Sequence, residues 1–378
     1  MKKTFLIIAI IFLIFIIGGL GGLFFDYLIF SRVMAHPVWS QNPLVKALDN
    51  RVRVIKNTEK VVVAESESIA DIASRTASSV VYIESTNANK TMVNGNGIVV
   101  SSDGVIATTD VVVPPNSTVQ YVKLADNSVY DVTAVYHDPY SRIVFLRIDA
   151  NDLATIPFAN SDDARSGKRL ISIARSRAGD ETHFALGGFL AHDYLFSIMA
   201  PKSDYLQGVL NIDFSPTVLS QSVGSPIIDF HGDMIGLISF KQEPETNTKD
   251  FYAIGANDVY NAFDEFLRAE NETATREHVA LGVDYHMITS LDAHVKNMDV
   301  TSGALIDMPQ TYAARKVFAQ SLAARSGLLG GDIVMLVNND VVDVKNNLAR
   351  LMYAHSDDER IELKVMRGDE IITVMVKK

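Results

Sequence analysis

The pattern of apolar and polar positions first marks a long apolar stretch near the N-terminus. An uncharged run extends over Phe5–Phe25, directly after Lys2 and Lys3. At about 1.5 Å per residue it spans roughly 30 Å, enough for one helix to cross a membrane. The two lysines favour a cytoplasmic N-terminus and place the rest of the chain outside. We therefore predict a cytoplasmic tip at residues 1–4 and a transmembrane anchor at residues 5–25.

A cleavable signal peptide is the alternative interpretation of this run. The apolar core of such a peptide is only about 7–15 residues long and is followed by small residues, whereas Asp26, Tyr27 and Leu28 follow here. The length favours a retained anchor. A single-pass membrane protein with its bulk in the periplasm or at the cell surface is therefore expected, with a proline-containing stalk at residues 26–67.

Beyond the stalk, the apolar positions change to short runs bounded by Gly, Asp, Asn or Ser. Many short strands with turn signals predict a mainly β barrel or sandwich. A helical pattern at Asp258–Glu270 closes this domain, which we place at residues 68–270. A polar linker at 271–278 and a small domain at 279–378 follow. The clearest predicted strands are Val80–Ile83, Gly97–Val100, Val119–Leu124, Ile143–Ile148, Leu170–Ala174 and Met234–Phe240.

Composition and charge exclude several functions. The chain has 34 Lys+Arg against 45 Asp+Glu, a net charge of -11, and no basic run, so a nucleic-acid partner is not expected. It has no cysteine, which excludes disulfides, thiolate metal sites and cysteine nucleophiles. The 9 histidines are scattered, and neither a metal motif nor a phosphate-binding loop is present. We predict no metal and no cofactor.

Several ordered segments resemble the signatures of the HtrA/Deg serine proteases, a family that includes membrane-anchored members. The resemblance covers residues 66–378 and implies a trypsin-like double β-barrel followed by an α+β PDZ domain. The segments that carry it are Gly95–Val112, Asp138–Ile148, Gln221–Asp229 with Gly232–Gly236, Ala280–Val283 and Ser321–Val334.

The residues at the catalytic positions depart from this family. Its first signature ends Thr-Asn-Asn-His-Val, and Val111 stands in place of the histidine base. Arg142 replaces the carboxylate that orients the base, and Val223 replaces the nucleophilic serine. In the turn that would form the oxyanion hole, Gln221 replaces the first glycine while Gly224 is retained. Because valine can neither take a proton nor attack a carbonyl, the resemblance implies a degenerate triad.

A rewired serine hydrolase is the alternative, because other hydroxyls and a histidine lie near the vacant nucleophile position. Ser220, Ser222, Ser225 and His231 are close in sequence, but their use would need a shift in register. Such serines commonly bond their own backbone in turns. His137 is a second candidate base, against the alternative of a histidine at a strand end.

The PDZ-like region retains the segments that bind peptides in the family. In the family the loop at Ala280–Val283 presents backbone N–H groups to the carboxylate of a peptide tail, and the next strand, at residues 283–285, accepts the peptide by β-augmentation. A facing helix is expected after Asp343. The alternative is that its apolar residues form only core. The predicted peptide-binding residues are Ala280, Leu281, Gly282, Val283, Leu348 and Leu351.

The sequence thus predicts a membrane-tethered, catalytically inactive HtrA/Deg-like protein. Its partners would be protein or peptide C-terminal tails, bound as a scaffold or regulator in envelope protein quality control. The alternative is an active trypsin-like endopeptidase with a rewired site. The family also implies a homotrimer or assembly with an active paralogue, which the residues leave open.

Overall fold

The computed structural model describes most of the chain after the predicted stalk. The predicted anchor, stalk and linker (271–278) lie outside the described residues, so these assignments stay predictions. No helix within the described part is long and apolar enough to cross a membrane. Asp71–Lys378 form one compact unit. The described residues are 69–176, 182–197, 202–242, 246–270, 279–296, 298–307 and 321–377.

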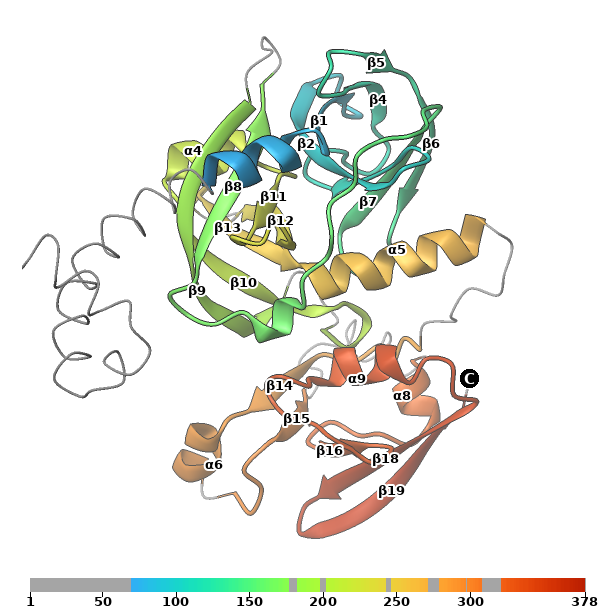
Figure 1. Cartoon of the computed structure of the whole chain (residues 1–378). Coiled ribbons are helices and arrows are strands. Elements are labelled where there is room, and N and C mark those ends of the chain that lie inside the picture. Colours follow the sequence, from blue (N-terminus) through green and yellow to red (C-terminus); the bar gives the residue numbers. More distant parts are fainter. Residues whose placement is uncertain are drawn as a thin grey trace, which may run out of the picture. The chain divides into compact units, whose positions relative to one another are not determined.

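After an α-helix at residues 69–77, the chain forms a seven-stranded antiparallel sheet of order β5-β4-β1-β2-β3-β7-β6 (Figure 1). The apolar runs predicted as strands form its centre, where β1 and β3 are almost wholly buried. The strands are β1 (Val80–Thr86), β2 (Met92–Ser101), β3 (Val105–Thr109), β4 (Thr118–Lys123), β5 (Val129–Tyr130), β6 (Val132–His137) and β7 (Ile143–Ile148).

The next strands close into a barrel of order β10-β13-β12-β11-β8-β9. The 3-10 helix η2 (Ser161–Asp163) precedes it, and η3 (Lys202–Asp204) and α4 (Pro216–Gln221) interrupt it. The sequence pattern did not predict η3 or α4. The strands are β8 (Arg169–Arg175), β9 (Thr182–Ser197), β10 (Gln207–Asp213), β11 (Pro226–Ile228), β12 (Met234–Gln242) and β13 (Lys249–Gly255).

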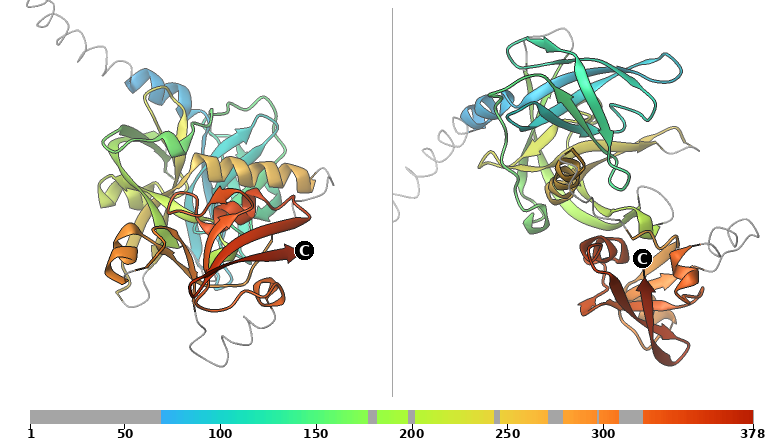
Figure 2. Two further views of the ribbon diagram at one scale, coloured as in Figure 1. Left: turned by 90° about the horizontal axis from the view of Figure 1, so that it is seen from below. Right: turned by 90° about the vertical axis from the view of Figure 1, so that its right-hand side faces the viewer.

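The predicted closing helix is confirmed as α5 (Ala256–Glu270), which lies along the seven-stranded sheet and the barrel (Figures 1 and 2). It contacts β7 of the first sheet and β12 and β13 of the barrel. The Phe266 ring stacks on Phe145, with 5.2 Å between ring centroids, and Phe263 lies 5.8 Å from Phe145. Aromatic packing of this kind fixes α5 against the first sheet.

The C-terminal region is α+β, as predicted. Its sheet has the order β14-β15-β16-β18-β19, with β17 paired to β16, so β14 and β19 are opposite edges. Its core includes Tyr285, Leu328, Leu348 and Leu363. The elements are β14 (Tyr285–Ile288), α6 (Ser290–Lys296), β15 (Gly303–Ile306), α8 (Leu322–Arg325), β16 (Ile333–Val337), β17 (Asp340–Val341), α9 (Leu348–Ala354), β18 (Arg360–Arg367) and β19 (Glu370–Lys377).

One expected boundary shifts in this region, because the strand after the loop starts at Tyr285 rather than at residue 283. The facing helix expected after Asp343 is α9, which begins at Leu348, where the Asn347 side chain caps it by accepting from the N–H of Arg350. The mainly β architecture is confirmed.

A histidine at the end of α9 makes the stability of this region depend on pH. The Nε2 atom of His355 lies 2.8 Å from an oxygen of Asp340, and its Nδ1 lies 2.9 Å from an oxygen of Asp358. Burial lowers the pKa of His355, but the two carboxylates outweigh burial and leave its pKa above the usual value. A raised pKa means that the charged imidazole stabilises the fold at low pH and that this is lost as pH rises through that pKa.

We therefore expect the melting temperature of the chain to fall as pH rises from about 6 to 8, by a few degrees, because partly exposed pairs are worth about 1 kcal/mol or less. His355→Gln should remove this component of the pH dependence. His183→Gln, at an exposed position, is the matched control and should leave it in place. An identical pH profile for wild type and His355→Gln would contradict the assignment.

Candidate functional site

The structure brings two of the three predicted catalytic positions into one apolar cluster. Val111 follows the end of β3, and Val223 follows α4 and its C-cap residue Ser222. Val223 is buried within a cluster that includes Val112 and Val113, and Val111 packs against it. The side chains at the two positions predicted for the base and the nucleophile are therefore packed in one apolar cluster.

The third position, Arg142, forms an ion pair instead of orienting a base. Its Nε donates to an oxygen of Asp110 at 2.7 Å, and its Nη1 reaches the Tyr252 hydroxyl at 3.4 Å. The Asp110 N–H donates to the Arg142 carbonyl at 3.0 Å, so side chain and backbone join the same two loops. Burial lowers the pKa of Arg142, but Asp110 outweighs it and raises that pKa, which keeps the guanidinium charged.

The sequence analysis did not predict a role for Asp110, although a comparison with the family signature could have indicated its ion pair with Arg142. The family signature has asparagine at this position, so a carboxylate here accompanies the cation at position 142. Position 142, where the family has a carboxylate that orients a histidine, carries a cation here, and the carboxylate lies at position 110. The ion pair preserves the connection between the two loops without supplying a proton acceptor to a nucleophile.

The turn that contains Val223 and Gly224 is tightly constrained. Gly224 has a φ of +79°, and a Cβ there would lie 2.1 Å from the carbonyl oxygen of Asn96. Its N–H donates to the Ile238 carbonyl at 2.8 Å. Gln221 is the last residue of α4, so its backbone is helical and its N–H points back along the helix. The retained glycine therefore serves the packing of the turn, and Gln221 belongs to a helix that the sequence did not predict.

Asn96 on β2 is a structural residue that the sequence analysis missed. Its N–H donates to the Val223 carbonyl at 2.8 Å, and its side-chain amide donates to the Gln221 carbonyl at 3.2 Å. Its Oδ1 accepts from the N–H of Arg175 at 2.7 Å. Asn96 thereby joins β2 to the turn at Val223 and to β8. These three contacts link positions far apart in sequence, so no local sequence pattern predicts them.

A cleft of about 280 Å³ lies beside this turn. Its wall includes Val223, Gln221, Ser220 and His183, together with the buried Arg175. The Arg175 guanidinium donates to the backbone carbonyls of Val80 at 2.8 Å and Ala77 at 3.1 Å. Burial lowers the pKa of Arg175. The predicted nucleophile position, Val223, thus lies in the wall of this cleft.

The alternative serine site does not assemble in the described residues. Ser222 is 3% exposed and Ser225 is fully buried. The His231 side chain is 81% exposed and its Nδ1 lies 3.2 Å from Asp229, which also accepts from Lys168 at 2.9 Å. Within the described part of the chain, no hydrogen bond joins either serine to a histidine. Ser220 lines the cleft together with His183, but its hydroxyl donates to the Thr217 carbonyl at 2.9 Å, and no described hydrogen bond joins it to a histidine.

His137 is also not placed as a base. It ends β6, where it is half-buried and pairs in the sheet with Val144. Burial lowers its pKa, and the charge of Asp110 only partly opposes this. No described hydrogen bond connects its ring to a hydroxyl. No group of three or more His, Asp or Glu in the described ranges is arranged to hold a metal ion.

The predicted tail-binding loop is present, but its side chains point into the core. Leu281, Val283 and Leu348 are at most 1% exposed and Leu351 is 8% exposed, all within one hydrophobic cluster. These side chains therefore do not line an open groove. What the loop offers is its backbone, which Gly282 bends with a φ of +68°. The residues predicted as tail-binding stay a prediction.

The backbone of this loop is hydrogen-bonded to the segment at η3. The Gly282 N–H donates to an oxygen of Asp204 at 3.0 Å, and the Val283 N–H donates to the Ser203 hydroxyl at 3.1 Å. The loop is itself held in place by α8, whose Ala323 N–H donates to the Leu281 carbonyl at 3.1 Å. In this structure the Gly282 N–H thus bonds a carboxylate oxygen and the Val283 N–H bonds a hydroxyl, and the chain itself supplies both acceptors.

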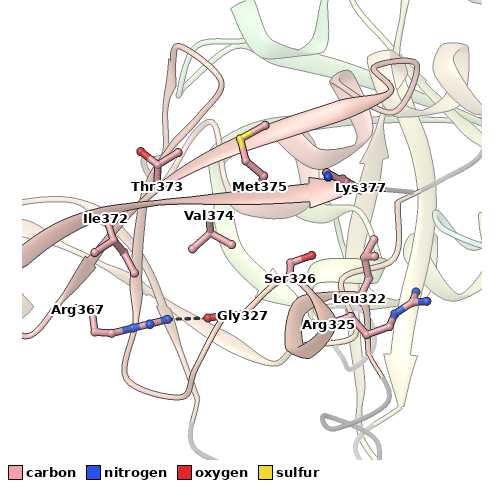
Figure 3. Close-up of a pocket in the computed structure, with 10 residues that line it drawn as sticks. All are labelled: Leu322, Arg325, Ser326, Gly327, Arg367, Ile372, Thr373, Val374, Met375 and Lys377. Atoms are coloured by element: carbon pink, nitrogen blue, oxygen red, sulfur yellow. Dashed lines mark hydrogen bonds between the residues drawn. The ribbon is translucent and has the colours of Figure 1, made fainter.

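A larger cavity, of about 620 Å³, lies between α8 and β19 (Figure 3). Arg325, Arg367 and Lys377 contribute to its wall, but Arg367 is paired with Asp332 at 2.8 Å. The strand β19 is the sheet edge opposite β14. This cavity therefore lies away from the strand next to the predicted tail-binding loop and contains none of the predicted site residues.

Comparison with known proteins agrees with this architecture. The model of the trypsin-like peptidase domain matches residues 95–237, and the model of the PDZ domain matches residues 279–377. The mitochondrial serine protease HTRA2 of Bos taurus is 25% identical over 323 residues, 82% of this chain and 66% of the relative. The chloroplastic Protease Do-like 1 of Arabidopsis thaliana is 26% identical over 254 residues, 66% of this chain and 55% of the relative.

Solved structures give the same fold. The HtrA-type protease AlgW with a decapeptide superposes with a TM-score of 0.56 at 17% identity, covering 82% of this chain and 97% of that chain. The same protease with a tripeptide gives a TM-score of 0.57 at 18% identity, covering 82% and 95%. The chain spans about half to two thirds of the length of its curated relatives.

The fold and these matches define the class of the chain: a trypsin-like peptidase domain followed by a PDZ domain. Over part of their length this chain is similar to serine proteases of the HtrA and Do-like type, and its fold is that of the solved HtrA-type protease structures.

Proposed function

We propose that this chain is a catalytically inactive HtrA/Deg-like protein that binds the C-terminal tails of other proteins through its PDZ domain. The contacts at the three triad positions support the inactivity. Val111 and Val223 share an apolar cluster, and Arg142 is paired with Asp110. A residual contribution from substrate binding cannot replace the proton transfer that the missing groups would perform.

One observation carries the binding half of the proposal: the loop already holds a carboxylate. Backbone N–H groups that bond a charged oxygen form stronger hydrogen bonds than they do with a neutral one. The oxygen at Gly282 belongs to Asp204, a side chain, but a terminal carboxylate has the same planar geometry and charge. Two of the superposed HtrA-type structures are described as carrying a decapeptide and a tripeptide, which is consistent with peptide recognition in proteins of this fold.

The role of scaffold or regulator in protein quality control belongs to the same proposal and rests on the resemblance to HtrA/Deg proteins. A domain that binds tails without cleaving them can present or retain a partner. We infer no role as an endopeptidase, since no described contact places a hydroxyl beside a base.

Paired peptides test the binding. We expect the full chain to bind decapeptides with a free C-terminal carboxylate about tenfold more tightly than their amidated twins, because amidation removes the charge that strengthens the N–H bonds. Fluorescence anisotropy with a peptide library, each member paired with its twin, measures the ratio. Equal affinities across the library would show that the loop is not a tail receptor.

A glycine pair supplies the control. A Cβ at Gly282 would lie 2.7 Å from the Cβ of Ser321 at a φ of +68°, so Gly282→Ala should distort the loop and remove the preference for free tails. Gly368→Ala has a similar φ of +61° but meets nothing within 4 Å. This variant introduces comparable backbone strain in the same domain and should keep the preference.

A further inference from the structure

The carboxylate on the tail-binding loop comes from the chain itself. We propose that Ser203 and Asp204, which lie between barrel strands β9 and β10, act as a built-in ligand that closes the tail site, so that an external tail binds only by displacing them. This inference rests on the proposed function and adds its regulation. Both residues belong to η3, a single turn of 3-10 helix.

Asp204 occupies the position that a terminal carboxylate would need. Its Oδ1 accepts from the Gly282 N–H at 3.0 Å and from the Ser203 hydroxyl at 3.0 Å. Burial raises the pKa of Asp204, and the bonds from Gly282, Ser203 and Leu281 only partly offset this. Because one N–H cannot serve two carboxylates equally well, a tail carboxylate must compete with Asp204 for this loop.

Ser203 occupies the neighbouring backbone groups. Its N–H donates to the Val283 carbonyl at 3.3 Å, and its hydroxyl accepts from the Val283 N–H at 3.1 Å. Ser203 is fully buried in this contact. Val283 leads into the edge strand β14, where an added peptide strand would begin its pairing. A bound tail would place its carboxylate at the Gly282 N–H and begin its strand pairing at Val283. Asp204 occupies the first of these positions and Ser203 occupies the second.

The second wall of the predicted groove is also engaged. Helix α9 contacts η3 directly. On the same helix Arg350 pairs with the buried Asp258 at 3.2 Å, and the Tyr353 hydroxyl donates to the Asn261 carbonyl at 3.4 Å. Both partners lie on α5. These contacts hold α9 against α5. Both the loop at Gly282 and the helix α9, the two sides of the predicted groove, are therefore bound to the domain that precedes them.

The energetic consequence is a reduced apparent affinity for tails. When only a fraction of molecules has an open site, the observed dissociation constant is the intrinsic one divided by that fraction. Removing the internal carboxylate should raise the open fraction. We expect Asp204→Ala in the full chain to bind free-carboxylate decapeptides about tenfold more tightly than wild type, with a smaller gain for Asp204→Asn, which keeps the shape and one acceptor oxygen.

The binding test uses the same library with the amidated twins. Asp131→Asn, an exposed carboxylate between β5 and β6, is the matched control and should bind as wild type does. Amidated peptides should gain little from Asp204→Ala, since they lack the group that takes over the loop. If Asp204→Ala and wild type bind free tails equally, Asp204 does not close the site.

Hydrogen exchange separates this inference from the proposed function. Without any peptide, the amides of Gly282 and Val283 should exchange faster in Asp204→Ala than in wild type or Asp131→Asn. Unchanged exchange at these amides would overturn the built-in ligand whatever the peptides do. Faster exchange together with no binding of free tails by any variant would leave the internal contact standing and show that tail binding is the wrong function.

Discussion

A single Val223→Ser substitution is expected to leave the chain without protease activity. The new hydroxyl would lie beside Val111 in the apolar cluster, and a valine would still stand where the family has the base that takes the serine's proton. Because the members of a triad act as a unit, one restored member recovers almost none of the roughly 10⁶-fold acceleration that a full triad contributes. Hydrolysis of a fluorescent unfolded protein should stay at the background rate of the wild-type chain.

Two serine variants and a labelling reagent complete this test. Ser222→Ala and Ser225→Ala should be indistinguishable from wild type, since both hydroxyls are buried. A serine-directed phosphonate should form no adduct with wild type or with Val223→Ser by intact mass. A stoichiometric adduct on Ser222 or Ser225 would show that the vacant triad has been replaced by another arrangement.

Restoring the family's carboxylate at position 142 is expected to destabilise the fold. In Arg142→Asp the cation that pairs with Asp110 is replaced by a second carboxylate, so two like charges meet in a partly buried site. Loss of one partner of a buried pair costs about 3 kcal/mol or more. The backbone is not the cause, because the φ of +63° at this position suits aspartate better than arginine. Urea unfolding followed by circular dichroism measures the loss.

A second substitution isolates the charge as the cause. Asp110→Asn brings back the family's residue at that position, and the double variant Asp110→Asn/Arg142→Asp should recover much of the lost stability. Asp110→Asn alone should cost less than Arg142→Asp, because it leaves a neutral acceptor next to the guanidinium. If the double variant is as unstable as Arg142→Asp, the ion pair is not what joins these loops.

Local pattern predicted the strands well because their cores are continuous apolar runs. The run at Ile143–Ile148 became β7 with the same bounds, and the helix at Asp258–Glu270 became α5. In both cases most of the apolar residues that carry the pattern are buried or packed against a neighbouring element. The motif spacing likewise placed Val111 and Val223, which the structure brings into one cluster.

The features that sequence reasoning missed depend on pairs of distant residues. Asn96 joins two turns through its side-chain amide, and Asp204 reaches Gly282 across a separation of 78 residues. Neither contact has a periodicity or a composition that marks it. Asp110 is the exception, since its departure from the family's asparagine accompanies the departure at Arg142 and could have indicated the ion pair.

The most direct test of the account recovers the peptides that the full chain has bound. The chain is incubated for hours with an equal mixture of free-carboxylate decapeptides and their amidated twins, and the bound fraction is eluted and weighed by mass spectrometry. The account predicts enrichment of free-carboxylate peptides at their full, uncleaved mass. Shortened peptides in the eluate, or equal recovery of amidated and free peptides, would contradict it.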